Sequence, residues 1–459
     1  MHRMSGSGPI RPRLAAAWRA LAVPVAAGLW AGVTLPAAGL AQQSPWRCPE
    51  PASLTGELTG ELAHVRYLAD DLLEGRAVAT RGERCAGDYI AARFAAIGLQ
   101  PAAENGGWFQ SWTVSSDNPH GGAVHGEARN VVAILPGSAP HRTQSLVIGA
   151  HYDHLGLGGF GSLSPDATGT VHNGADDNAS GTAVLIEAAR ALASGPPLAQ
   201  DVLFIAFTGE ERGLWGSAHY VNAPLLPLEG TVAMLNLDMV GRVRDGLLTV
   251  MGTGTAEEWE VIPERANASI AAPLDLRFNS DGFGASDHTS FYARGIPVLH
   301  FFSNTHPDYH RVEDDWELVN AEGMDRVTDL VAAVVREVVP AAGMASLTPV
   351  EGAGNPHGVS ASGDASSMAS GFRVRLGTIP DYSRESGGMA ITAVREGGPA
   401  AEAGLQGGDI IVKFGPHEID TVYDYMAALN EYDPGDEVEI VVLRGEERLS
   451  FTAVLVAGG

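Results

Sequence analysis

The stretch SLVIGAHYDHLG, residues 145–156, joins a continuous apolar run to a cluster of histidine and aspartate side chains. Similar β-rich runs recur along the chain, and helical patterns such as 178–193 separate them. The other runs are NVVAILPG (130–137), DVLFIAFTGEE (201–211), TVAMLNLDMVG (231–241) and IPVLHFF (296–302). Continuous apolar strands alternating with helices predict an α/β fold, in which helices sandwich a mainly parallel mixed sheet.

Side chains that can bind metal ions follow the ends of these predicted strands. Open α/β sheets place their sites at the carboxyl edges of strands, so we expect these side chains to converge. They are His151, Asp177, Glu210, Glu211, Asp238 and His310. Two imidazoles, three carboxylates and one spare carboxylate suit two zinc ions that share a bridging aspartate, and predict attack of metal-activated water on a carbonyl.

Three of these motifs also have plainer interpretations. Asp177 lies in NGADDNASG before a predicted helix, where Asp and Asn serve as caps. The Glu210–Glu211 pair could be a solvated acidic turn, although that interpretation fits poorly after the apolar run VLFIAF. Asp238 lies within an apolar strand, where a carboxylate is costly unless it is paired or bound to metal.

The histidine motifs leave two assignments to be decided. A zinc-bound histidine usually donates its second N–H to an acceptor, and Asp153 could accept that bond from His151. His154 would leave a strand on the side opposite His151. His306, in HPDYHRVEDDW at 306–316, is the nearest competitor of His310 for the role of ligand.

Taken together, residues 61–335 resemble metallopeptidase family 28, the co-catalytic dizinc aminopeptidases. The resemblance includes EGR at 74–76 and SDHTSF at 286–291. It implies that Asp177 bridges two zinc ions, with His151 and Asp238 completing one site and Glu211 and His310 the other. It also implies that Glu210 is the general base, that Asp153 orients His151, and that the Asp177–Asn178 peptide bond is cis.

The resemblance implies an exopeptidase that hydrolyses the N-terminal bonds of peptides or proteins. Tyr309, Phe301 and Phe302 are expected to line its side-chain pocket, because they lie near His310 in the sequence. Three alternatives remain open: a carboxypeptidase of the same family, a one-zinc glutaminyl cyclase, and a non-catalytic binding protein on the same fold.

The N-terminal residues predict export. Arg3, Arg11 and Arg13 precede an apolar run from about Ala20, and Gly39-Leu40-Ala41 forms a small-x-small cleavage site before Gln42. An uncleaved membrane anchor is the alternative, but the run is short for a spanning helix. We therefore expect a signal peptide at 1–41, a periplasmic or extracellular mature protein, and no stable membrane insertion.

Two cysteines, Cys48 and Cys85, lie near the start of the expected mature chain. In an oxidising compartment an even number of cysteines predicts a disulfide, whereas two free buried thiols are the alternative. The net charge of −26 argues against a nucleic-acid partner, which would require basic surfaces.

The C-terminal part of the chain forms a second unit. A catalytic domain is expected at 42–341, and a Gly-, Ser- and Pro-rich stretch predicts a flexible linker at 342–370. Residues 371–459, with GGPAAEAGLQGGDIIVKFG inside them, resemble a small β-rich PDZ domain of the bacterial protease type. The resemblance implies a peptide ligand added to a sheet edge, with 376–379 as the carboxylate-binding loop, whereas a packing or positioning module is the alternative.

Overall fold

The computed structural model describes residues 46–116, 123–159, 161–340, 345, 347–350, 374–380, 387–394, 397–420, 422–429, 431–445 and 447–457. The predicted signal peptide at 1–41 and most of the predicted linker at 342–370 lie outside the described residues. Across the described ranges, none of the helices combines the length and the apolar character that crossing a bilayer requires.

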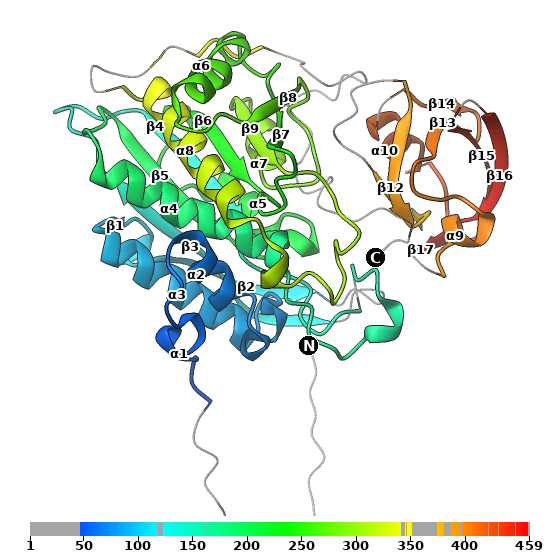
Figure 1. The fold of residues 1–459 in the computed structure, drawn as a ribbon, viewed down its shortest axis with the longest axis horizontal. Helices are drawn as coiled ribbons and strands as arrows, with labels where there is room; N and C mark the ends of the chain where they lie inside the picture. Colours follow the sequence, from blue (N-terminus) through cyan, green and yellow to red (C-terminus); the bar gives the residue numbers. More distant parts are fainter. Residues whose placement is uncertain are drawn as a thin grey trace, which may run out of the picture. The chain divides into compact units, whose positions relative to one another are not determined.

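A nine-stranded sheet forms the core of the part of the chain before the predicted linker. Its strand order is β1-β3-β5-β4-β6-β9-β7-β8, with β2 paired to β3 (Figure 1). Its strands are β1 (Gln100–Pro101), β2 (Phe109–Ser116), β3 (Val124–Leu135), β4 (Ser145–His151), β5 (Asp201–Phe207), β6 (Thr231–Leu237), β7 (Leu247–Met251), β8 (Asp275–Asn279) and β9 (Val298–Phe302). The central pairs β5-β4, β4-β6 and β6-β9 are parallel, whereas β3-β5 and β9-β7 are antiparallel. The predicted mainly parallel mixed sheet is confirmed.

Helices cover both faces of this sheet because its strands are apolar on both sides. On one face, Leu146 and Ile148 of β4 share a buried core with the helices α2 (Gly60–Leu68), α3 (Arg81–Ile97), α4 (Gly181–Ser194), α6 (Ile262–Ser269) and α8 (Ala321–Val338). On the other face, Val147 packs in a second core with α5 (Trp215–Asn222) and α7 (His288–Tyr292). Figure 1 shows α4 and α8 running along the same face.

The stretch at 62–76, in which apolar residues recur at helical spacing, forms two helical segments. Helix α2 ends at Leu68, and a 3₁₀ segment, η1 (Asp71–Arg76), follows it. The side chain of Asp70 caps the new segment by accepting a hydrogen bond from the N–H of Leu72 at 2.9 Å. Gly75 then adopts a φ of 66°, which turns the chain and directs Arg76 into the interior.

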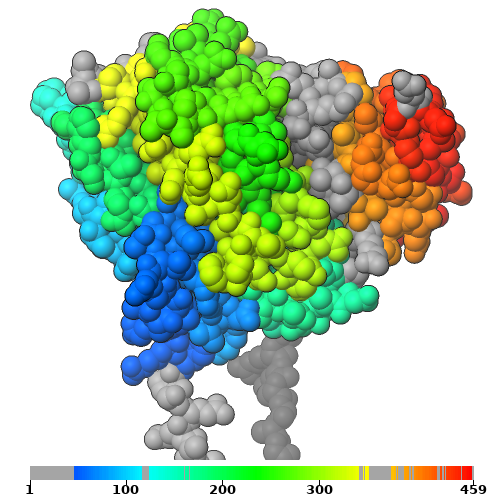
Figure 2. Space-filling view, viewed as in Figure 1, coloured from blue at the N-terminus to red at the C-terminus, as the bar shows by residue number. Residues whose placement is uncertain are grey.

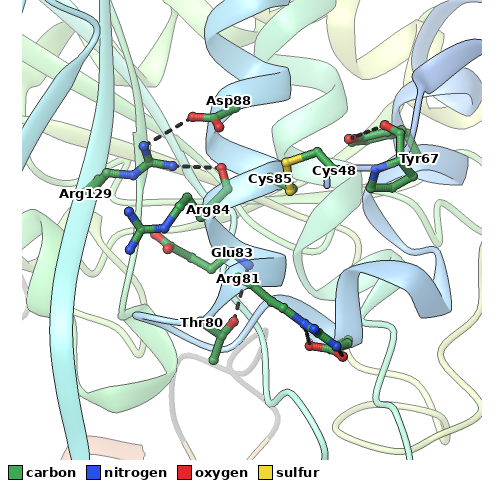
Figure 3. Close-up of a disulfide and its surroundings, with 11 residues drawn as sticks. Cys48, Tyr67, Thr80, Arg81, Glu83, Arg84, Cys85, Asp88 and Arg129 are labelled. Carbon is green, nitrogen blue, oxygen red and sulfur yellow. Dashed lines mark hydrogen bonds and ion pairs between the residues drawn. A yellow bond between two sulfur atoms is a disulfide. The ribbon is translucent and has the colours of Figure 1, made fainter. Parts of the chain in front are cut away.

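A disulfide and helix packing attach the N-terminal segment to the rest of the domain. Cys48 and Cys85 form a disulfide with a Cα–Cα distance of 5.4 Å, which joins the residues before α1 (Pro51–Thr55) to α3 (Figure 3). The prediction of a disulfide is therefore confirmed. Helix α2 also contacts η8 (Trp316–Leu318), and Figure 2 shows the blue N-terminal surface beside the yellow-green surface of that part of the chain.

The C-terminal unit has its own core and its own antiparallel sheet, in the order β11-β12-β13-β15-β16. Its elements are β10 (Val374–Arg375), β11 (Thr378–Pro380), β12 (Met389–Val394), α9 (Pro399–Ala403), β13 (Ile410–Phe414), β14 (His417–Glu418), α10 (Val422–Leu429), β15 (Glu437–Arg444), β16 (Glu447–Val454) and β17 (Val456–Ala457). Gly404 ends α9 with a φ of 94°, a left-handed conformation that glycine adopts readily.

Candidate metal centre

Three parallel strands deliver acidic and imidazole side chains to one edge of the sheet. His151 is the last residue of β4, Asp238 directly follows β6, and Glu210 begins the short segment η5 (Glu210–Arg212) after β5. Asp177 comes from the turn before α4, and His310 comes from the loop after β9. All six predicted residues, including Glu211, therefore lie at the same edge.

The two oxygens of Asp177 face two different histidines. Its Oδ1 atom lies 3.2 Å from Nε2 of His151, and its Oδ2 atom lies 3.0 Å from Nε2 of His310. Nε2 of His151 also lies 3.4 Å from Oδ1 of Asp238, and Nε2 of His310 lies 3.2 Å from Oε2 of Glu211. The carboxylate of Asp177 thus lies between two groups, each of which contains one imidazole and one further carboxylate.

These residues suit a pair of metal ions. Within the described ranges, His151 Nε2 and Asp238 Oδ1 are buried polar atoms without a hydrogen-bond partner. Atoms that could bind a metal ion lie within 4.8 Å of one another in two groups, His151–Glu210–Asp238 and His154–Asp177–Glu211. Imidazole nitrogens and carboxylate oxygens are donors that zinc accepts, although other divalent metals bind such sets as well.

The acidic surroundings control the charge of the two histidines. Burial by itself lowers the pKa of His151, but the carboxylates of Asp238 and Glu210 outweigh burial and raise that pKa well above its ordinary value. Burial and Glu211 compete in the same way at His310, and the pKa of His310 is also raised well above its ordinary value. Protons therefore occupy these nitrogens when no metal ion does.

The carboxylates of the centre differ in their pKa values. Burial raises the pKa of Asp177, but hydrogen bonds to His151 and His310 outweigh burial and hold that pKa well below its usual range. Burial is also outweighed at Glu211, where the charge of His310 lowers the pKa to about 2. Burial dominates at Glu210 and raises its pKa well above the usual value. Glu210 is therefore the carboxylate of this group that most readily takes a proton.

Asp153 contacts both His151 and Glu210. The Nδ1 atom of His151 lies 3.2 Å from the backbone oxygen of Asp153 and 3.7 Å from its carboxylate. Oδ1 of Asp153 accepts a hydrogen bond from the backbone N–H of Glu210 at 3.1 Å. Asp153 thus contacts the predicted ligand mainly through its backbone, and the predicted base through its side chain.

The prediction that His154 faces away from the site is wrong. Its Nδ1 atom lies 2.7 Å from Oε1 of Glu211, and its side chain is buried. Strand β4 ends at His151, so the alternation of a strand does not extend to residue 154. His306, in contrast, lies 3.2 Å from Oδ2 of Asp176, and its ion pairs within the described part of the chain are with Asp176 and Asp308.

Two buried residues that the sequence patterns did not single out hold the loops of the centre. The guanidinium of Arg76 donates hydrogen bonds to the carbonyls of Asn173 at 2.7 Å and Gly174 at 2.9 Å, in the loop that leads to Asp177. Oδ2 of Asp314 accepts hydrogen bonds from the backbone N–H groups of Asp176 and Asp177, at 2.9 and 3.1 Å. The available signals were the positions of Arg76 within EGR and of Asp314 within HPDYHRVEDDW.

The turn that carries Asp177 contains the cis peptide bond that the resemblance implies, between Asp177 and Asn178. The side chain of Asn178 donates to the carbonyl of Leu237 at 2.9 Å and accepts from the N–H of Gly181 at 2.8 Å. These bonds connect the turn to the end of β6 and to the start of α4.

A cavity adjoins the centre. Asp177, Glu210 and Asp238 line one part of it, and Phe302 and Tyr309 line another. Phe301, which was expected beside them, is instead buried in the core beneath the sheet. Alternate residues of a strand face opposite sides, so Phe302 and Phe301 cannot both face the cavity.

Residues 130–335 match the model of peptidase family M28, and residues 371–455 match a PDZ domain. Aminopeptidase YwaD of Bacillus subtilis is 31% identical over 226 residues, which are 46% of this chain and 45% of that protein. The chain thus spans about half the length of curated relatives that it matches.

Two solved structures are also similar. A zinc aminopeptidase of Bacillus subtilis aligns with a TM-score of 0.47 and 20% identity, over 64% of this chain and 96% of that one. The glutaminyl cyclase of Porphyromonas gingivalis aligns with a TM-score of 0.49 and 19% identity, over 61% and 98%. From the family matches, the chain contains a peptidase family M28 domain at residues 130–335, followed by a PDZ domain at residues 371–455.

Proposed function

We propose that the chain is a dizinc aminopeptidase, which hydrolyses the N-terminal bonds of peptides or proteins. The observation that carries the proposal is the position of Asp177, whose two oxygens lie 3.2 and 3.0 Å from Nε2 of His151 and of His310. A carboxylate placed in this way can bridge two metal ions. The aminopeptidase named among the relatives supports the same activity.

Five residues would hold the metal ions. His151 and Asp238 are proposed for one ion, Glu211 and His310 for the other, and Asp177 for both. When bound, the pair of ions would polarise the substrate carbonyl and make a water molecule more acidic.

Glu210 would transfer the proton in this mechanism. Its Oε2 atom lies 3.9 Å from Nε2 of His151, so its carboxylate borders the predicted ligands without replacing one of them. It would accept a proton from the attacking water and then donate it to the amine that leaves. Asp153 would hold Glu210 in place through the bond to its backbone N–H.

A division of the chain into four parts accompanies the proposed activity. We propose a cleaved signal peptide at 1–41, a catalytic domain at 42–341, a linker at 342–370 and a PDZ domain at 371–459, in an exported periplasmic or extracellular protein. The Cys48–Cys85 disulfide supports export, because such bonds persist in oxidising compartments.

We propose that the PDZ domain recruits peptide substrates. Deletion of the chain after Ser370 tests this, with short and long peptides compared as substrates. A selective loss of activity on long peptides is expected, and unchanged selectivity would contradict recruitment.

The decisive experiment for the activity combines metal analysis with a substrate panel. Close to two zinc ions per chain and cleavage of aminoacyl amides, but not of N-acetylated controls, are expected. Cleavage of C-terminally free peptides from their C-terminus would support the carboxypeptidase alternative. About one zinc ion, with cyclisation of N-terminal glutamine, would support the cyclase, and a chain without metal or activity would support a binding protein.

A further inference from the structure

Two stacked imidazoles line the cavity beside the metal centre. His288 is the first residue of α7, and His300 lies in the middle of β9. Their ring centroids are 4.4 Å apart and their planes are inclined by 9°. Both rings border the cavity that Asp177, Glu210 and Asp238 also line, so this surface is continuous with the proposed reaction centre.

Of the two imidazoles, His300 presents a hydrogen-bonding atom to this space, and His288 stacks on its ring. His288 is fully buried, and neither of its ring nitrogens has a hydrogen-bond partner anywhere in the described ranges. A neutral imidazole carries one donor and one acceptor. At His300, Nδ1 lies 3.1 Å from Nδ2 of Asn236, which makes Nδ1 the acceptor and leaves the proton of a neutral ring on Nε2. An unsatisfied buried donor is costly, so a ligand that accepts a hydrogen bond from Nε2 of His300 is favoured.

Both rings are uncharged at neutral pH. Burial lowers the pKa of His288 well below its ordinary value, and burial lowers the pKa of His300 to about 4. Neighbouring parts of the cavity wall are also uncharged, and they are formed by Met251, Gly284, Ala285 and Phe302. This end of the cavity therefore offers a hydrogen bond to a substrate side chain. It offers no charged group that could pair with an ionic side chain.

The backbone of Gly284 packs closely against the His288 ring. A Cβ atom at this position would lie 2.8 Å from Nε2 and 2.9 Å from Cε1 of that ring. Any larger residue would therefore press against His288 and, through the stacked pair of rings, against His300.

Resting on the proposed aminopeptidase activity, we propose that His300, whose ring stacks on His288, determines specificity at the pocket for the N-terminal side chain. Its Nε2–H selects uncharged side chains that accept a hydrogen bond, such as asparagine, glutamine and threonine. Apolar side chains of the same shape are disfavoured because they leave this nitrogen unpaired.

Isosteric substrate pairs test this proposal. We would measure kcat/KM for asparaginyl against leucyl, glutaminyl against methionyl, and threonyl against valyl amides, with one common leaving group. The wild-type protein is expected to prefer the hydrogen-bonding member of at least one pair by about tenfold or more. His300→Met, which keeps a side chain of similar length but removes the polar edge, is expected to abolish or reverse that preference.

Two further variants make the result specific. Gly284→Ala should reduce the same ratio, because the added methyl group would press on the His288 ring and so displace the stacked ring of His300. Val261→Leu exchanges one exposed apolar residue for another outside the cavity lining, so the ratio should change little. If His300→Met does not fold, as judged by circular dichroism, Gly284→Ala carries the test.

The outcomes separate the two proposals. A wild-type protein that cleaves leucyl, methionyl and valyl amides best, with ratios unaffected by the variants, overturns the specificity but leaves the aminopeptidase activity intact. A zinc-loaded protein that cleaves none of the aminoacyl amides overturns both.

Discussion

Oδ2 of Asp314 accepts a hydrogen bond from the backbone N–H of Asp177 at 3.1 Å. Asp314 is fully buried, and its other oxygen lies 3.1 Å from the guanidinium of Arg242. The loop that contains Asp314 also carries His310. A single carboxylate thus connects the turn of the proposed bridging ligand to the loop of a second proposed ligand.

Asp314→Ala is expected to weaken metal binding. The substitution leaves two buried N–H groups without their acceptor, so the Asp177 turn loses its fixed position. Outer partners of metal ligands typically contribute 10–100-fold to metal affinity. Zinc retained per chain after dialysis against graded chelator concentrations measures the effect. Asp308→Asn, at a partly exposed partner of Arg242, is the matched control and should retain zinc.

Glu210→Gln is expected to keep both metal ions and to lose activity. The amide cannot accept the proton of the attacking water, whereas the five proposed ligands are unchanged. A general base contributes about 10²–10⁴-fold to the rate, so kcat should fall by that factor. Glu229→Gln, at an exposed position, is the control for loss of one negative charge. Near-normal turnover in the zinc-loaded Glu210→Gln protein would remove the base assignment.

Metal binding at neutral pH is expected to release protons. The pKa values of His151 and His310 are raised well above the ordinary value in the metal-free protein, so both rings are protonated there. Metal binding requires the neutral rings, so apparent metal affinity should fall as pH falls through these raised pKa values. Titration calorimetry in buffers of different ionisation enthalpy counts the protons. A binding enthalpy that is independent of the buffer would contradict the expectation.

Replacement of both Cys48 and Cys85 by alanine is expected to lower stability without changing the chemistry. The disulfide spans a sequence separation of 37 residues, for which loop-closure entropy gives a stabilisation of about 3–4 kcal/mol. Denaturant unfolding of the zinc-loaded protein measures this loss. The kcat of the folded variant should match the wild type, since neither cysteine lies among the proposed ligands. An unchanged unfolding midpoint would show that the bond adds no stability.

Much of this protein could be predicted from the order of its motifs. The apolar runs at 145–150 and 201–206 predict buried parallel strands, and parallel strands bring their carboxyl ends to one edge. His151, Glu210 and Asp238 follow such strands, so their meeting needs only local sequence and topology. The Cys48–Cys85 bond could also be predicted from the sequence, because the chain contains no other cysteine.

Only the tertiary structure decided which neighbours face the site. His154 lies beyond the last residue of β4, where the loop directs its side chain to Glu211. His300 and Phe302 face the cavity while Phe301 faces the core, since a strand turns alternate residues to opposite faces. Asp314 reaches Asp177 across 137 residues of chain. Sequence spacing carries no information about such contacts, because loops that are far apart in the chain meet only when the sheet and its helices pack.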